Sequence, residues 1–196
     1  MNRHIRRAAA AGACLLTAAA LLLAGRNARR SGGALVADID LEDYGTITVS
    51  LDREAAPETV DNFIFLARSG FYNGLTIFRA VDGFLIQGGA DPDGEAGSVR
   101  AIHGEFARNG VDNPLSHTRG AISMVRDEDY DSASSQFFIV QEDSTYLDGS
   151  YAAFGYVVSG MDVVDQICRR AQPGDPSGFL PAEQQPVISS VTVRQR

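Results

Sequence analysis

The chain has 196 residues, and 17 basic residues against 25 acidic ones give it a formal net charge of −8. Residues 1–30 hold six arginines and no acid, so residues 31–196 contain 11 basic and 25 acidic residues and carry a net charge of −14. Such an acidic domain repels phosphate backbones and anionic lipid surfaces, which argues against nucleic acid as a partner and favours a soluble monomer.

The first 30 residues have the composition of an export segment. Arg3, Arg6 and Arg7 precede an Ala/Leu-rich run at residues 8–25, which is at the short end of what can span a bilayer. No clean Ala-x-Ala site precedes the next arginines, so a cleaved signal peptide and a retained membrane anchor both stay open. Either one predicts an exported protein that is periplasmic or otherwise extracytoplasmic. Residues 31–34 then form a linker, and residues 35–196 form the domain.

The domain begins with alternating apolar residues at 36–41 and 47–51, separated by the turn residues 43–45. This pattern predicts an opening β-hairpin. Next, Pro57 begins a segment with apolar residues at helical spacing, which predicts a helix that ends at Gly70.

The rest of the chain contains six further short β-type runs and one more amphipathic helix. The runs lie at residues 76–81, 84–87, 121–125, 136–140, 153–158 and 187–193, and the helix lies at residues 162–170. Strands and helices do not alternate as they do in parallel-sheet folds, so we expect an antiparallel barrel or sandwich with helices at its ends. The stretches 91–119 and 173–186 are predicted loops, where binding residues are often found.

Several kinds of chemistry are disfavoured. After residue 30 the only histidines are His103 and His117, without metal-ligand spacing, and there is no Gly-x-Ser-x-Gly motif. The acidic residues of 91–95 lack the glycine spacing of a calcium loop, so a solvated loop is expected there. Because Cys168 is the only cysteine after residue 30, no internal disulfide is possible in residues 31–196. We expect neither a metal nor another cofactor.

Three polar residues lie within otherwise apolar strands: Arg79, Gln87 and Gln136. Strand alternation places Gln87 beside Leu85, and Gln136 beside Phe138, on one face of their strands. Such a surface can hold an apolar ring and hydrogen-bond a peptide backbone. Alternatively, the three polar groups only satisfy each other and tie down loops, since buried polar groups need partners.

The motifs PETVDNFIFLARSGFYNGL, FRAVDGFLIQGG, HTRGAISMVR, SQFFIV and YLDGSYAAFGYVVSGMDVVDQI occur in this order. Together they closely resemble the cyclophilin family of peptidyl-prolyl cis-trans isomerases, over residues 35–193. The resemblance implies a closed eight-stranded antiparallel β-barrel capped by two α-helices. It also implies an enzyme that isomerises Xaa-Pro bonds in proline-containing polypeptides and so assists the folding of exported proteins.

The resemblance also implies roles for individual residues. Arg79 matches the catalytic arginine that donates to the prolyl nitrogen, and Gln87 matches the glutamine that holds the substrate backbone. His117 matches a position better explained by packing and is left out of the site. For Arg126 the resemblance concerns mainly the main chain. The substrate-binding residues would be Phe84, Leu85, Val125, Arg126, Gln136, Phe138, Tyr146, Leu147 and Tyr151.

The chain departs from the best-known eukaryotic members at three positions. Phe78 and Tyr151 stand where those members have histidines, and Tyr146 stands where they have a tryptophan. The tyrosines at 146 and 151 are similar to those of bacterial members and still offer a hydroxyl group. We expect activity to survive and cyclosporin to bind weakly, because the indole donor is missing. The competing hypothesis is a non-catalytic proline-peptide-binding or chaperone module. Arg79 favours the enzyme, since a binding groove alone needs no donor at the prolyl nitrogen.

Overall fold

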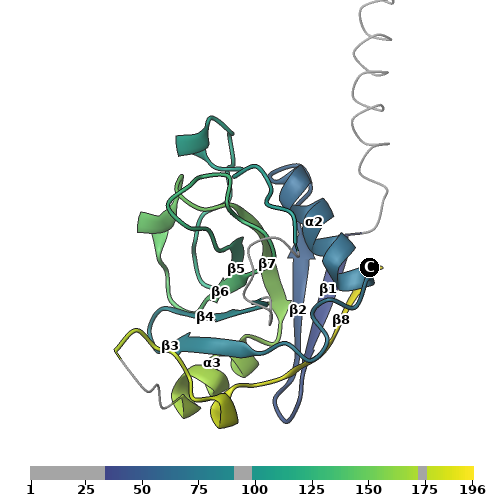
Figure 1. Ribbon diagram of the computed structural model, residues 1–196, viewed down its shortest axis with the longest axis vertical. Helices are drawn as coiled ribbons and strands as arrows, with labels where there is room; N and C mark the ends of the chain where they lie inside the picture. Colours follow the sequence, from purple (N-terminus) through teal and green to yellow (C-terminus); the bar gives the residue numbers. More distant parts are fainter. Residues whose placement is uncertain (1–33, 91–98, 172–175) are drawn as a thin grey trace, which may run out of the picture. The chain divides into compact units, whose positions relative to one another are not determined.

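The computed structural model describes residues 34–90, 99–171 and 176–196 (Figure 1). The predicted export segment, and the linker up to residue 33, lie outside these ranges, so both remain predictions. No helix in the described ranges has the length and hydropathy needed to cross a membrane.

In the described ranges, eight strands and two α-helices follow one another in the predicted order, and their ends agree with the predictions within two residues. Three short 3-10 helices were not predicted, because a single turn carries no apolar period. The elements are β1 (Leu35–Leu41), β2 (Gly45–Leu51), α2 (Pro57–Arg68), β3 (Ile77–Val81), β4 (Leu85–Gly88), η1 (Ala107–Asn109), β5 (Ala121–Met124), β6 (Phe137–Val140), η2 (Thr145–Leu147), β7 (Ala153–Ser159), α3 (Met161–Arg170), η3 (Ala182–Gln184) and β8 (Ile188–Gln195).

The strands form one antiparallel sheet in the order β3-β4-β6-β5-β7-β2-β1-β8, curled into an open half-barrel. The predicted closed barrel is therefore wrong. In the described residues, β3 and β8 meet only near the bridge between Thr76 and Val187. Further along β3, the outer edge is paired instead with residues 178–180, which keeps β8 away from it. Closure by a continuous β3–β8 ladder is thus prevented.

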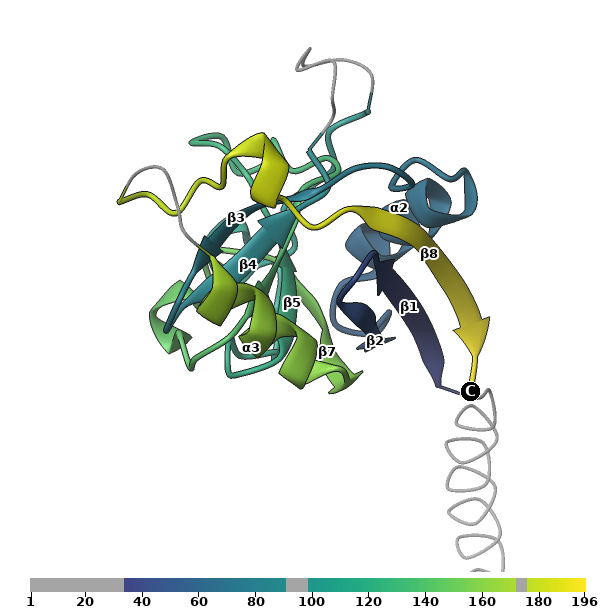
Figure 2. The same ribbon diagram turned by 90° about the horizontal axis from the view of Figure 1, so that it is seen from below.

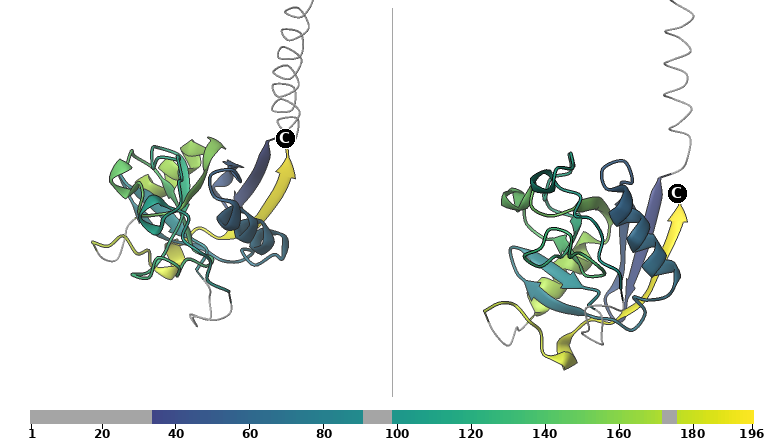
Figure 3. Two further views of the ribbon diagram at one scale, coloured as in Figure 1. Left: turned by 90° about the horizontal axis from the view of Figure 1, so that it is seen from above. Right: turned by 45° about the horizontal axis from the view of Figure 1, so that its top comes forward.

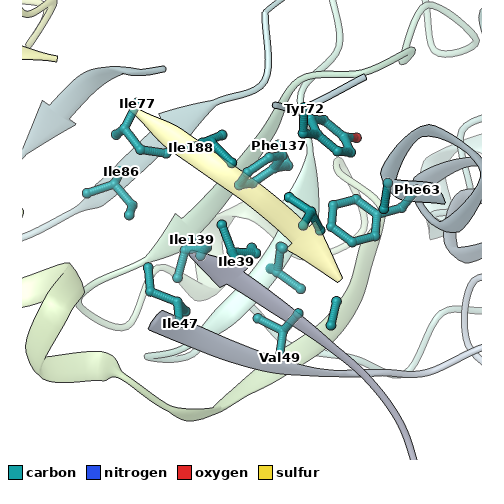
Figure 4. Close-up of a cluster of buried hydrophobic side chains, with 14 of the residues drawn as sticks. Ile39, Ile47, Val49, Phe63, Tyr72, Ile77, Ile86, Phe137, Ile139 and Ile188 are labelled. Atoms are coloured by element: carbon teal, nitrogen blue, oxygen red, sulfur yellow. The ribbon is translucent and has the colours of Figure 1, made fainter. Parts of the chain in front are cut away.

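A single apolar core fills the inside of the curled sheet. Figure 4 shows Ile39, Ile47, Ile86 and Ile139 from four strands together with Phe63 of α2. The two helices lie at opposite ends of the sheet, and β8 runs beside β1 (Figures 2 and 3). Both helices bury their apolar stripes in this core, so the sheet is held firmly from the inside and its outer face is left for binding.

Cys168 is the free cysteine of α3, and it is part of the core. Burial raises the pKa of its thiol to about 12, so the thiol stays protonated at neutral pH. A protonated, enclosed thiol is a poor nucleophile, which makes Cys168 a packing residue.

The N-terminus of α2 depends on a residue far along the chain. The N-cap residue, Ala56, has no side chain that could cap the helix. Instead, the buried carboxylate of Glu105 accepts hydrogen bonds from the backbone N–H groups of Glu58 (3.0 Å) and Thr59 (2.7 Å). A negative charge at this end also suits the helix dipole. Glu105 thereby fastens the loop after residue 99 to α2.

Replacing Glu105 by alanine is expected to lower the free energy of unfolding by about 2–3 kcal/mol, because two N–H groups lose a charged acceptor. Urea unfolding would measure this loss. Glu54→Ala serves as the control, since Glu54 is exposed and should cost less than about 0.5 kcal/mol. Equal urea midpoints for the two variants would contradict the capping role of Glu105.

Candidate active site

Three neighbouring strands bring Arg79, Gln87 and Phe138 into one row. Arg79 of β3 is paired with Gln87 of β4, and Gln87 is paired with Phe138 of β6. Directly paired residues of antiparallel strands point to the same face of a sheet. This face is the outer one, because the next residues along β3 and β4, Ala80 and Ile86, belong to the core.

The polar side chains in and beside this row form a chain of hydrogen bonds. Arg79 Nη1 donates to Gln87 Oε1 at 3.1 Å, and Gln87 Nε2 donates to Gln136 Oε1 at 3.1 Å. Arg79 Nε donates to the carbonyl oxygen of Ser177 at 2.7 Å. The three polar residues therefore do satisfy each other, as one of the two interpretations expected. They also fix the guanidinium at the rim of a pocket, so the two interpretations are compatible.

Beside the guanidinium lies a pocket of about 240 Å³. Its floor belongs to a small apolar cluster on the outer face, in which Phe138 is buried. The rings of Phe138 and Tyr151 are nearly perpendicular, at 88°, with their centroids 5.8 Å apart. Pockets for drug-sized ligands are larger, about 300–1,000 Å³, so this one suits a single small ring. The lining residues are Arg79, Phe84, Leu85, Gln87, Val125, Arg126, Phe138, Leu147 and Tyr151.

All the residues predicted for the site line this pocket, except Gln136 and Tyr146. Gln136 does not line the pocket, but its side chain accepts a hydrogen bond from Gln87, which does. Tyr146 is 71% exposed and stacks on Phe84 with ring centroids 6.1 Å apart. The geometry thus brings the predicted residues together, while the role of each one in binding or catalysis stays a prediction.

The side chain of Arg126 has a larger part in the pocket than the sequence indicated. Its guanidinium lies over the rings of Phe106, Tyr130 and Tyr151, with 5.3, 4.9 and 4.9 Å from Cζ to the ring centroids. It also donates from Nε to the carbonyl oxygen of Ser150 at 2.9 Å. Cation–π contacts with rings from three segments hold the pocket wall together. Phe106 and Tyr130 were missed because sequence spacing does not reveal such a cluster.

His117 lies directly behind the pocket floor. It is 1% exposed, its ring stacks on Phe138 at 5.8 Å, its Nδ1 lies 2.8 Å from Asp148 Oδ1, and its Nε2 lies 3.0 Å from Ser123 Oγ. This Ser-His-Asp order resembles a hydrolytic triad. However, Ser123 is fully buried, so no substrate can reach its hydroxyl. The arrangement therefore supports Phe138 from behind.

Burial lowers the pKa of His117, although the neighbouring Asp148 carboxylate partly raises it. In the unfolded chain a histidine has a pKa of about 6.5. The stability contributed by the neutral ring is thus complete above about pH 6.5, and it is lost as the pH falls towards the lower folded-state value. We therefore expect the urea midpoint of unfolding to decrease as the pH is lowered from 7.5 to 5.

In the variant His117→Gln this part of the pH dependence should be absent. All other groups are the same in the two proteins, so their contributions cancel in the comparison. The measurement is the slope of the unfolding free energy against pH in each protein, and identical slopes would show that His117 does not carry the effect.

Among the residues that the structure describes, no three His, Cys, Asp or Glu side chains are grouped so that they could hold a metal ion. The pocket offers instead the guanidinium groups of Arg79 and Arg126, the primary amide of Gln87 and an apolar floor. Such a set can bind and polarise an amide, but it offers no accessible nucleophile of the serine or cysteine kind.

The chain is similar in sequence to known isomerases. The family described as "Cyclophilin type peptidyl-prolyl cis-trans isomerase/CLD" matches residues 36–193. Peptidyl-prolyl cis-trans isomerase A of Dickeya dadantii is 41% identical over 128 residues, which cover 63% of this chain and 66%, just under two thirds, of that protein. Peptidyl-prolyl cis-trans isomerase B of Escherichia coli is 39% identical over 132 residues, which cover 63% of this chain and 79% of that protein.

Solved structures share the fold. A cyclophilin-type isomerase of Cryptosporidium parvum, crystallised in the presence of the dipeptide Ala-Pro, has a TM-score of 0.69 and 24% identity, with 82% of this chain and 99% of that chain covered. A cyclophilin of Hirschia baltica has a TM-score of 0.65 and 22% identity, with 80% and 73% covered. At these identities the likeness establishes the arrangement of strands and helices.

Proposed function

Since the chain belongs to the cyclophilin-type peptidyl-prolyl cis-trans isomerase family, we propose that it isomerises peptide bonds that precede proline. Arg79 and the pocket over Phe138 would carry out this reaction. The proposal rests on one observation above all. A guanidinium that is fixed by two hydrogen bonds lies at the rim of an apolar pocket suited to a single ring.

The barrier to this reaction comes from amide resonance. Rotation about the bond requires the loss of its partial double-bond character, which costs about 18–20 kcal/mol. No covalent bond breaks, so a catalyst needs only to bind the twisted amide more tightly than the planar one. An acceleration of about five orders of magnitude corresponds to about 7 kcal/mol of such differential binding.

The pocket supplies two effects of this kind. The apolar floor holds the prolyl ring and excludes water that would favour the planar, more dipolar amide. As the amide twists, the lone pair localises on the prolyl nitrogen, and an N–H group of Arg79 donates to it. Gln87 holds both the guanidinium and, through its remaining hydrogen-bonding capacity, the substrate backbone.

The substrate class follows from the pocket size and from comparison with a relative. The structure of the Cryptosporidium protein was determined with Ala-Pro, which supports proline-containing peptides as ligands here. Unfolded chains and exposed loops present proline-containing segments.

We place the protein outside the cytoplasm, where it would assist the folding of exported proteins. The support is the sequence of residues 1–30, with arginines before an apolar run. A fusion of residues 1–34 to a reporter enzyme that is active only outside the cytoplasm would test this. N-terminal sequencing of the exported protein would then distinguish a cleaved signal peptide from a retained anchor. An inactive reporter in intact bacteria would refute export.

Exchange spectroscopy on an Ala-Pro peptide tests the activity itself. Catalytic amounts of the protein should raise the cis/trans exchange rate far above that of the peptide alone, and resonances of the pocket residues should shift when the peptide is added. If the resonances of the folded protein shifted on peptide addition but the cis/trans exchange rate of the peptide did not rise, the protein would instead be a binding module.

A further inference from the structure

The segment Ser177–Leu180 extends the sheet at the outer edge of β3. Ala80 N–H donates to the carbonyl oxygen of Gly178 at 2.9 Å, and Leu180 N–H donates to that of Phe78 at 2.8 Å. Between these bonds Phe179 is paired with Arg79 in antiparallel fashion. β3 is the last strand of the sheet order, so this segment covers an edge that would otherwise be open.

This pairing brings a carbonyl group to the catalytic side chain. The carbonyl oxygen of Ser177 accepts from Arg79 Nε at 2.7 Å, while Gln87 Oε1 accepts from Nη1 at 3.1 Å. One bond alone would let the guanidinium turn about it, because an arginine side chain has several freely rotating bonds. Two bonds to different nitrogens define both the position and the plane of the group.

Only a glycine allows the segment to approach β3 this closely. Gly178 has φ +88°, a left-handed backbone conformation that residues with a Cβ rarely adopt. A Cβ atom at this position would also lie 2.4 Å from Val81 Cγ2 and 2.9 Å from the carbonyl oxygen of Ala80. A side chain at residue 178 would therefore push the segment, and with it the carbonyl group of Ser177, away from Arg79.

We propose that Gly178 is a positioning residue for the isomerisation reaction, because its missing side chain lets the Ser177 carbonyl group orient the Arg79 guanidinium. The inference rests on the proposed role of Arg79 in catalysis. Gly178 itself does not line the pocket. Gly178 affects the reaction through one hydrogen bond, from Arg79 Nε to the carbonyl oxygen of Ser177. This effect can therefore be measured separately from a general effect on folding.

The first test is Gly178→Ala in the full chain. A displacement of a catalytic group by about 1 Å costs up to about a hundredfold in rate, so we expect kcat on an Ala-Pro peptide to fall by about ten- to a hundredfold. KM should change by less than about twofold, because the pocket floor is untouched. Wild-type kcat in this variant would overturn the proposal while leaving the isomerase function intact.

Gly74→Ala is the matched control. Gly74 has a similar φ of +83°, but a Cβ there would meet no atom within 4 Å. It lies between α2 and β3, outside the pocket, so its alanine variant carries the same backbone strain without displacing the segment. We expect its kcat to stay near that of the wild type. An equal loss of kcat in both glycine variants would mean that backbone strain alone is responsible, and would refute the positioning role.

A double-mutant comparison separates positioning from a structural role. The variant Arg79→Lys lacks the guanidinium Nε–H that donates to the carbonyl group of Ser177. If Gly178 acts through Arg79, adding Gly178→Ala to Arg79→Lys should lower kcat by less than about twofold. Multiplication of the two single losses would refute the proposal. Should Gly178→Ala fail to fold, the wild-type protein still gives an answer: the Arg79 Nε–H resonance should exchange slowly with solvent, and rapid exchange would overturn the proposal.

Discussion

Arg79→Ala is expected to lower kcat for an Ala-Pro peptide by about a hundred- to a thousandfold, the loss typical of removing one donor that acts in the transition state. The ground-state peptide keeps its contacts with the pocket floor, so KM should change little. Exchange spectroscopy at several peptide concentrations separates the two constants. The same variant leaves Gln87 Oε1 without its arginine partner, but Gln87 is only partly buried and can turn to water.

Two further variants make this result specific. Arg79→Lys keeps a positive charge but cannot bond both Ser177 and Gln87 in a planar arrangement, so it should recover only a small part of the lost rate. Arg194→Ala removes an exposed arginine that pairs with Asp38 on β1, away from the pocket, and should leave kcat unchanged. If Arg79→Ala retained more than a tenth of the wild-type kcat, rotation would be driven by the apolar pocket alone.

Local patterns were sufficient to predict the elements of the fold. Each strand carries an alternating or continuous apolar run, and each helix begins and ends at a recognisable residue, such as Pro57 for α2. Closure of the barrel was predicted wrongly because it depends on which segments reach the outer edge of β3. That edge is taken by residues 178–180, and nothing in their local pattern indicates a strand.

The candidate site was predictable to the extent that it lies on strands. Arg79 and Gln87 stand out because each is a polar residue in an apolar strand, and the pairing of β3, β4 and β6 then brings them beside Phe138. Residues that act from loops gave no such signal. Glu105 caps a helix 46 residues earlier in the chain, and the rings around Arg126 come from separate segments, so both depend on the tertiary fold.

Phe138→Ala is expected to have the largest effect on stability among the pocket residues. The side chain is 4% exposed, and its ring stacks on His117 and lies nearly perpendicular to the ring of Tyr151. Removing a buried phenylalanine ring costs about 3–5 kcal/mol of unfolding free energy. Urea unfolding would measure this cost. The kinetic result should be the reverse of that for Arg79→Ala, with a raised KM, because the prolyl ring loses the surface against which it binds.

Phe137 provides the comparison that separates the two roles of Phe138. The two phenylalanines are neighbours on β6 and are both buried, but Phe137 packs into the main core, where its ring lies nearly perpendicular to that of Phe63. Phe137→Leu and Phe138→Leu should therefore cost similar amounts of stability, and both should still fold. Only Phe138→Leu should raise KM for the Ala-Pro peptide. If both variants raised KM equally, the effect would come from loosening β6, and Phe138 would have no separate role as the surface that receives the prolyl ring.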